Sequence, residues 1–395
     1  MKNTKRIAII SFYHEESSLC LAKHIAKLGY LVDYYYINCP PSNGIVPGFE
    51  FWRAKINWGL QQLKDSEIPE IANYMEGLPV RLFLITYDTR RRFSIPRLDK
   101  ITLWYTCYKI RKKHYDAINI VGQVEYVQYC HKYLRSENIT HTFHEIGSHQ
   151  NNITSSPTVN ISIRDNSKVI LHSYATYQRF ISIPYADIDR TTVIHFGKFE
   201  TSLLYTKDID MNIPLDLRKP TFLFFGMIKP YKGLDNLAEA IKTLAPFKDK
   251  FNLIIAGKGI DPSLSFFESL SNCWVYNNFL KNDEMMHLIS ICSIVVLPYH
   301  SASQTGIIPT ISLYGKPAIA TSVGAFPEFI KNGKNGILIE KDNPVALAEA
   351  MQSIIDHPDI LSQISSGAAM FGNNDQFDWD GIANKTISFL LDKQF

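Results

Sequence analysis

Four features are missing or scarce in this 395-residue sequence, and each one argues against a class of protein. No apolar run approaches the roughly 18 residues that a membrane-spanning helix needs. The formal net charge is only +3, which gives no bulk electrostatic case for nucleic-acid binding. The six cysteines include no Cys-x-x-Cys pair, so we expect reduced, buried thiols of a cytosolic protein. The N-terminus MKNTKRIAIISFY leads into HEESS rather than a small-residue cleavage site, so we expect no signal peptide.

Short apolar runs alternate with helical patterns along the whole chain, and 46% of the residues are apolar. The opening predicts a strand at Arg6–Phe12, a polar loop at Tyr13–Ser18, a helix at Leu19–Leu28 and a strand at Leu31–Ile37. Phe51–Leu63 has helical periodicity. Strands that alternate with helices predict α/β domains with parallel sheets, and the length predicts two of them.

The stretch Phe199–Lys219 has little apolar order and holds Pro214, with Pro220 directly after it, so we expect an interdomain linker there. The predicted domains are residues 1–200 and 220–376.

Two loops that follow predicted buried strands have the composition of phosphate sites. Thr221–Phe225 leads into Gly226–Gly233, and Ile294–Leu297 leads into the small, polar loop HSASQT. A helix is predicted after each loop, so each helix N-terminus points unpaired N–H groups at its loop. With Lys229 and Lys232, these amides would hold a diphosphate without a metal ion; two exposed surface lysines are the alternative.

Four motifs in this half occur in an order that one known family shares. They are FFGMIKPYKGLDNLAEAI, LIIAGKG, ICSIVVLPYH and GKPAIATSVGAFPEFIKNGKNGILI. Over roughly residues 220–355 the chain resembles the donor-binding domain of retaining glycosyltransferases of family 4. The resemblance implies the α/β GT-B fold, in which two Rossmann-like domains face a central cleft. It implies that residues 1–200 hold an acceptor and residues 220–376 hold a nucleotide sugar. It also implies metal-independent transfer with retention, and the tail 377–395 resembles the helix that returns to the N-terminal domain.

The same resemblance implies a donor site. Lys232 matches the phosphate-binding lysine, and Lys229 is expected to replace the arginine that is Met227 here. Glu328 is the remaining acid, with an N-terminal helix charge as its alternative role. The other expected contacts are Gly226, Gly257, Phe279, Leu280, Ser303, Gln304, Thr305 and Gly306.

Two family features are missing. The spaced pair of glutamates falls near Ala302 and Thr310, and neither residue is acidic. The segment SQTGIIPTISLYGKP instead resembles a variant found in envelope-glycan enzymes. The glycine-rich loop that often follows the first strand is replaced by Glu15–Ser18.

Thr140–His149 ends a predicted strand and holds His141, His144 and His149. A metal site is one interpretation, but strand alternation separates neighbouring side chains and no Cys or Asp joins them, so we predict no metal. By resemblance, His144 and Glu145 lie near the transferred sugar; a structural histidine is the alternative. The resemblance also places three residues at the cleft: Ser173, His195 and Gly197.

Residues 89–114 are strongly basic and are interleaved with Phe93, Trp104, Tyr105 and Tyr108. One interpretation is a solvated helix face with aromatic core on the other side. The other is a surface that rests on anionic lipid, where a lipid-linked acceptor would be presented. Nucleic acid is not predicted as a partner.

These features together predict an enzyme. We expect a glycosyltransferase that moves a sugar from a UDP or GDP sugar to a glycan or lipid-linked acceptor, without a cofactor, in cell-surface polysaccharide synthesis. It is expected in the cytoplasm or at the inner face of the cell membrane. The alternative is a catalytically inactive, nucleotide-sugar-binding subunit of a glycosyltransferase complex, because the acidic pair is lost.

Overall fold

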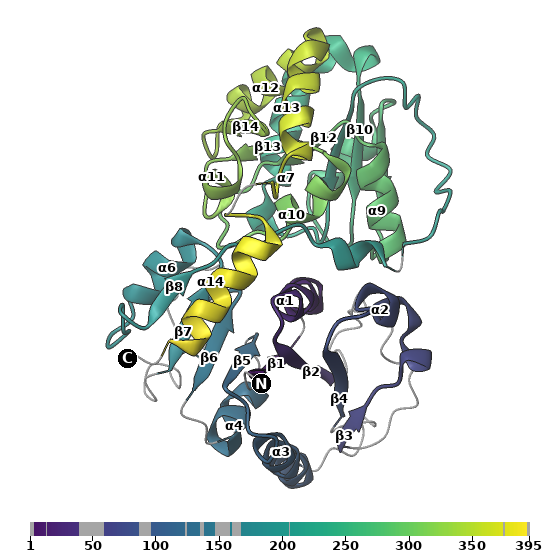
Figure 1. Ribbon diagram of the computed structural model, residues 1–395. Helices are drawn as coiled ribbons and strands as arrows, with labels where there is room; N and C mark the ends of the chain where they lie inside the picture. The colour runs from purple at the N-terminus through teal and green to yellow at the C-terminus, as the bar shows by residue number, and fades with distance from the viewer. Residues whose placement is uncertain are drawn as a thin grey trace. The chain divides into compact units, whose positions relative to one another are not determined.

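The computed structural model (Figure 1) describes residues 4–12, 14–38, 59–86, 96–122, 125–134, 138–146, 159, 167–204, 206–373 and 376–392. The chain forms two compact units, Met1–Leu204 with Asp375–Phe395, and Tyr205–Asn374. The segment predicted as a linker, 199–219, is divided between them after Leu204.

The first unit is built on an eight-stranded sheet in the order β3-β4-β2-β1-β5-β6-β7-β8. Neighbouring strands are parallel except β3, which runs antiparallel to β4. The strands are β1 (Arg6–Ser11), β2 (Leu31–Asn38), β3 (Gly59–Gln62), β4 (Val80–Thr86), β5 (Ala117–Val121), β6 (Ile139–Phe143), β7 (Lys168–Leu171) and β8 (Thr191–Val193). The strand order reverses between β1 and β5, which is where a crevice forms at the carboxyl edge of such a sheet.

Helices cover this sheet because its strands are apolar on both faces. They are α1 (Glu15–Lys27), α2 (Pro69–Tyr74), α3 (Pro96–Arg111), α4 (Glu125–Leu134), α6 (Tyr174–Ile181) and α14 (Trp379–Leu391). In β1, Ala8 and Ile10 pack with Leu103 of α3 and Leu134 of α4 in one buried cluster. Ile9, whose side chain points to the other face of the strand, is also fully buried.

Two local predictions in the first unit were wrong. The predicted polar loop Tyr13–Ser18 is largely the first turn of α1, because the Ser18 hydroxyl is buried within 2.9 Å of both Ser11 Oγ and Tyr34 Oη. The predicted helix Phe51–Leu63 is a strand over Gly59–Gln62, because this backbone pairs antiparallel with β4; residues 51–58 lie outside the described residues.

The predicted C-terminal helix is α14, which belongs to the first unit. Trp379 Nε1 donates to the Lys198 carbonyl at 2.7 Å, and Lys168 Nζ donates to the Phe389 carbonyl at 2.8 Å. Asp378 caps the helix by accepting from the Gly381 N–H, and Asp380 lies 2.6 Å from His24 Nδ1. The Asp-x-Asp sequence of the tail is therefore structural.

The second unit is built on a six-stranded parallel sheet in the order β11-β10-β9-β12-β13-β14. The strands are β9 (Thr221–Phe225), β10 (Asn252–Ala256), β11 (Cys273–Tyr276), β12 (Ile294–Leu297), β13 (Ala318–Thr321) and β14 (Gly336–Ile339). The two strands predicted in this half, Thr221–Phe225 and Ile294–Leu297, are β9 and β12 with the predicted bounds.

The helices of the second unit are α7 (Leu234–Thr243), α8 (Leu264–Glu268), α9 (Asn282–Ile291), α10 (Ile307–Ile311), α11 (Phe326–Phe329), α12 (Pro344–Asp356) and α13 (Pro358–Ala369). The apolar stripe of α7, which includes Leu237 and Ile241, packs with Leu347 and Met351 of α12 over Phe222 of the sheet. The thiols of the described cysteines are free; Cys20, Cys107, Cys130 and Cys292 are buried, and Cys39 lies outside the described residues.

Candidate functional site

The carboxyl edge of the second sheet has one position where two loops diverge. The chain passes from β9 to β10 and β11 on one side, and returns to β12 on the other side of β9. The loops after β9 and β12 therefore leave neighbouring strands in opposite directions, which opens a crevice for a ligand. These are the two loops whose composition predicted a phosphate site.

Glycines let the backbones of these loops approach closely. Gly233 precedes α7 with a φ of +68°, and a Cβ on it would lie 1.9 Å from the Pro298 carbonyl oxygen. Gly257, with a φ of +139°, would place a Cβ 2.0 Å from the Gly226 carbonyl oxygen. Only glycine fits at either position, and both contacts hold the loops after β9, β10 and β12 side by side.

Lys232 is the buried cation of this crevice. Its side chain is 7% exposed, and its Nζ would lie 2.9 Å from a Cβ on Gly226. Burial, and then the charge of Lys229, lowers the pKa of Lys232 to about 8. Within the described part of the chain no carboxylate lies within ion-pair distance of the ammonium, and its Nζ lies 5.4 Å from the centroid of the Tyr299 ring. A buried ammonium without a counter-charge gains free energy when an anion binds.

Two more polar atoms near this crevice are buried without a partner among the described residues. They are Tyr299 Oη and Gln304 Oε1. Ser303 and Thr305 are also buried, and Thr305 Oγ1 accepts from the Ile307 N–H at 3.2 Å. A phenol can donate to a phosphate or sugar oxygen, and an amide oxygen can accept from a sugar hydroxyl. A bound ligand would therefore satisfy groups that the protein alone leaves unsatisfied.

Tyr299 and His300 were not predicted as site residues. His300 Nδ1 lies 2.5 Å from Asp342 Oδ1 and its Nε2 lies 2.9 Å from Asp235 Oδ1, so the loop after β12 is tied to α7 and to the turn after β14. Burial opposes protonation of His300, but the two carboxylates outweigh it and raise its pKa. The sequence signal was weak, because both aspartates are distant along the chain.

Three of the remaining predicted donor contacts, Gly257, Phe279 and Leu280, lie on two neighbouring loops. Gly257 N–H donates to the Tyr276 carbonyl and Gly259 N–H donates to Asn277 Oδ1, which places the turn after β10 beside the loop that contains Phe279 and Leu280. Phe279 is 38% exposed on that loop.

Glu328 lies in the first turn of α11, a helix of only four residues, which keeps its alternative role as a helix charge open. The helix predicted after the HSASQT loop is α10, which begins at Ile307 after Gly306 at its N-cap. The helix is too short for its dipole to contribute much, so the binding groups here are single amides and side chains.

In the first unit, histidines gather at the carboxyl ends of four strands. The rings of His14 and His144 stack with centroids 3.4 Å apart, and His172 lies 4.7 Å from His144. Burial lowers the pKa of His14 to about 4 and of His172 to about 3; burial and then the charges of His14 and His172 lower the pKa of His144 well below its usual value. These imidazoles are neutral at physiological pH.

The tautomer of His172 follows from one hydrogen bond. Its Nδ1 donates to the Ile194 carbonyl at 2.7 Å, so its Nε2 is an acceptor. Nε2 of His172 and Nε2 of His144 are buried, and neither has a partner among the residues that the structure describes. Glu145 directly follows His144 and its charge acts on His14.

Other predicted residues of the first unit have structural roles or lie elsewhere. Ser173 caps α6 by accepting from the Thr176 N–H at 3.1 Å. A Cβ on Gly197 would lie 2.7 Å from Trp379 Nε1, so this glycine seats α14. His195 packs edge-on against Phe377, and His149 lies outside the described residues. His141 is fully buried in β6, with its Nε2 2.9 Å from His131 Nδ1.

Helix α3 exposes its aromatic residues. Trp104 and Tyr105 are each 50% exposed and Tyr108 is 37% exposed, whereas Leu103, Cys107 and Ile110 face the core. The interpretation that placed these aromatics in the core was therefore wrong. The exposed face also carries Lys109, Arg111 and Lys112, and the side chains of 89–99 lie outside the described residues.

Among the described residues, no group of three His, Cys, Asp or Glu side chains is placed to hold a metal ion. Within the same residues, no helix combines the length and the apolarity that crossing a membrane requires.

Comparison with known proteins agrees with this geometry. Residues 219–357 match the family model described as "Glycosyl transferases group 1". An uncharacterized glycosyltransferase of Methanocaldococcus jannaschii is 29% identical over 166 residues, which are 40% of this chain and 44% of that protein. The chain spans about half the length of the curated relatives it matches.

Solved structures match nearly the whole chain. Sucrose-phosphate synthase from Thermosynechococcus elongatus has a TM-score of 0.66 at 16% identity and covers 97% of this chain and 98% of its own. HepE of Anabaena, solved with UDP, has a TM-score of 0.62 at 16% identity and covers 98% and 99%. The fold of this chain is therefore the GT-B fold, with two Rossmann-like α/β domains. The match to the group 1 glycosyl transferase model lies within its second unit.

The buried ammonium predicts a pH-dependent affinity for inorganic pyrophosphate. Lys232 is protonated below its pKa of about 8, so the dissociation constant should rise as pH increases through that value. In a Lys232→Arg variant the charge persists, and the part of the pH dependence that comes from this side chain should vanish. Calorimetric titrations of both proteins across this range measure the difference; identical pH profiles would contradict the assignment.

Proposed function

We propose that this protein is a retaining glycosyltransferase of family 4 that moves a sugar from a UDP or GDP sugar to a glycan or lipid-linked acceptor. The proposal rests on one observation above all: the buried, uncompensated Lys232 ammonium between two loops at the strand-order reversal of the second unit. The group 1 match over this segment supports it. HepE has a similar fold and was solved with UDP, so UDP sugars are the first donors to test.

The chemistry asks the donor site to stabilise a leaving diphosphate. Negative charge grows on the diphosphate as the bond between the sugar and the diphosphate breaks, and the buried Lys232 ammonium stabilises that charge. Lys229 and the amides of the two loops add to it, so the proposed reaction uses no divalent ion. Tyr299 Oη and Gln304 Oε1 would bind oxygens and hydroxyls of the same donor.

The first unit is proposed to hold the acceptor. Neutral His172 is suited to accept a hydrogen bond from an acceptor hydroxyl through its unpartnered Nε2, and neutral His144 offers a second unpartnered Nε2 for a hydrogen bond with such a hydroxyl. Glu145 and Glu328 are proposed as the carboxylates of the reaction, because the family's spaced glutamate pair is absent.

Two observations bear on the biological setting. The SQTGIIPTISLYGKP segment resembles envelope-glycan enzymes, which supports a role in cell-surface polysaccharide synthesis. The exposed aromatic and basic face of α3 supports contact with an anionic membrane surface, where a lipid-linked acceptor would lie. A cytoplasmic protein at the inner membrane face fits both.

A second candidate is a catalytically inactive subunit that only binds a nucleotide sugar. The observation that favours it is the loss of both family glutamates near Ala302 and Thr310. It predicts donor binding without turnover.

Turnover of a panel of UDP, GDP, ADP and CMP sugars, with glycan and lipid-linked acceptors, separates the two candidates. We expect transfer from one donor, and a loss of about 100- to 1,000-fold in kcat/KM for Lys232→Ala, because one stabilising charge of the transition state is removed. Lys242→Ala is the matched control, since Lys242 is exposed on α7 and pairs with Glu239. Thermal stabilisation by a donor without transfer to any acceptor would support the inactive subunit instead.

Sedimentation with vesicles tests the membrane contact. The unsubstituted protein should bind phosphatidylglycerol vesicles, and Trp104→Ala should weaken that binding about tenfold, because a half-exposed indole no longer enters the interface. Tyr185, which is 93% exposed in the same unit, gives the control Tyr185→Ala. Equal binding by all three proteins, or none by the unsubstituted one, would rule out this role for α3.

A further inference from the structure

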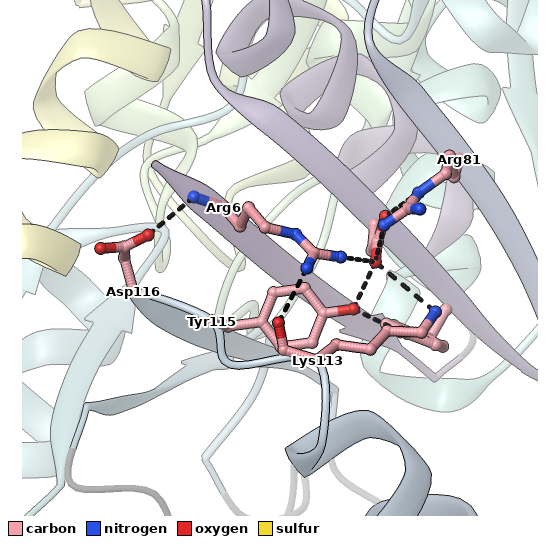
Figure 2. Close-up of polar contacts among 7 residues, drawn as sticks. Arg6, Arg81, Lys113, Tyr115 and Asp116 are labelled. Atoms are coloured by element: carbon pink, nitrogen blue, oxygen red, sulfur yellow. Dashed lines mark hydrogen bonds and ion pairs between the residues drawn. The ribbon is translucent and has the colours of Figure 1, made fainter. Parts of the chain in front are cut away.

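The amino edge of the first sheet carries a cluster of cations. The histidines described above lie at the other, carboxyl edge of the same sheet. Its centre is Asp33 in β2, which is only 2% exposed. Arg6 begins β1, Arg81 is in β4, and Lys113 and Tyr115 precede β5. Figure 2 shows these basic side chains converging on the same carboxylate, with Asp116 at the other end of Arg6.

Asp33 is fully engaged by this cluster. Arg81 forms a bidentate pair with it, with Nε 2.7 Å from Oδ1 and Nη2 2.8 Å from Oδ2. Arg6 Nη2 donates to Oδ2 at 3.3 Å, and Lys113 Nζ lies 3.6 Å from the same oxygen. The Tyr115 hydroxyl also donates to Oδ2. Each cation is therefore held in a fixed position by one buried acid.

The charges do not balance. Three cations face one buried carboxylate, and one arginine would be enough to neutralise it. The next acid, Asp116, is exposed, and its carboxylate accepts from the backbone N–H of Arg6 rather than from the guanidinium. Holding like charges together costs free energy, so an ion pair that served only stability would not need the second and third cations.

A cavity of about 340 Å³ opens beside these cations. It is lined by the two guanidinium-bearing residues and three apolar neighbours: Arg6, Arg81, Leu31, Pro79 and Val80. The Arg81 side chain is 47% exposed and that of Arg6 is 29% exposed, so both remain accessible to a solute. The volume lies within the range of small-molecule sites.

We propose that Arg6, Arg81 and Lys113 form a binding site for a phosphate group, either a phosphomonoester or a phosphodiester. Phosphate fits the surplus positive charge. Asp33 occupies the Nε–Nη2 edge of Arg81, so a phosphate would accept from the remaining hydrogens of Arg81 Nη1 and Nη2. Asp33 is a positioning residue: it fixes the side chains of the three cations, and those cations would contact the ligand.

The residues of this site all belong to the first unit, whereas Lys232 belongs to the second. The ligand is a lipid headgroup or a soluble phosphate ester. Both carry the same chemistry, and Lys109, Arg111 and Lys112 at the end of α3 lie just before Lys113 in the chain.

The first test is chemical protection on the full chain. Phenylglyoxal modifies arginines, and peptide mass spectrometry locates each product. Lys232→Ala is used as the background, so that the proposed donor site does not contribute. Inorganic phosphate at about ten times its dissociation constant should slow modification of Arg81 about tenfold. Arg218 is the internal control, since it pairs with Asp216 through Nε and Nη2 at 2.7 and 3.0 Å in the same bidentate way but in the second unit.

Vesicles distinguish the two ligand sources. Protection of Arg81 by phosphatidylglycerol vesicles, and not by phosphatidylcholine vesicles, supports the site with a lipid headgroup as its ligand. Protection by inorganic phosphate alone supports it with a soluble ester. No protection of Arg81 by any of these, or equal slowing at Arg218, would overturn the proposal.

A variant series gives an independent measure in the same background. Arg81→Gln should weaken phosphate binding by about tenfold or more, and Arg81→Lys, which keeps the charge but loses the fork, should weaken it less. Arg218→Gln should leave binding unchanged. Circular dichroism monitors folding, and the protection experiment on unsubstituted Arg81 stands even if the variants fold poorly. Unchanged affinity in a folded Arg81→Gln protein would also overturn the proposal. Donor turnover is not involved, so the proposed enzymatic function is tested separately.

Discussion

The interaction on which the second unit depends is the burial of one ammonium group, that of Lys232, against glycine backbone. Gly226 has no Cβ and so leaves room for Nζ, while Gly233 and Gly257 let three loops touch through their main chains. Burial, and then the charge of Lys229, lowers the pKa of Lys232 to about 8. A bound anion would stabilise the charged form and raise this pKa again. The parallel sheet and the hydrogen bonds of His300 hold the loops around this buried cation in place.

The two units treat charge at their carboxyl edges in opposite ways. The second unit holds the buried Lys232 ammonium, which would be stabilised by a bound anion. The first holds neutral imidazoles, because burial in a stack of His14, His144 and His172 disfavours protonation. The carboxyl edge of the second sheet is thus suited to a diphosphate and that of the first sheet to hydroxyl groups. The proposed sugar transfer needs both, one for the donor and one for the acceptor. Arg6, Arg81 and Lys113 lie at the amino edge of the first sheet, around Asp33.

The sequence was sufficient for the second unit because its signals are local. β9 and β12 are short apolar runs closed by Gly226 and Pro298, so strands, loops and Lys232 could be predicted from neighbouring residues alone. Contacts between residues that are distant in the sequence could not be predicted in this way. The Oη of Tyr299 is notable only because the fold buries it, and His300 matters only because Asp235 and Asp342 meet it in space. Likewise, Gly59–Gln62 became a strand through pairing with β4, and the first turn of α1 formed where Ser18 meets Tyr34.

The most direct test of the central claim is an experimental structure of the protein with UDP, solved with and without magnesium. The account predicts the diphosphate within hydrogen-bond distance of Lys232 Nζ and of the amides around Gly226 and Gly306, with no ion between them. A diphosphate bound away from Lys232, or one held through a divalent cation, would contradict it.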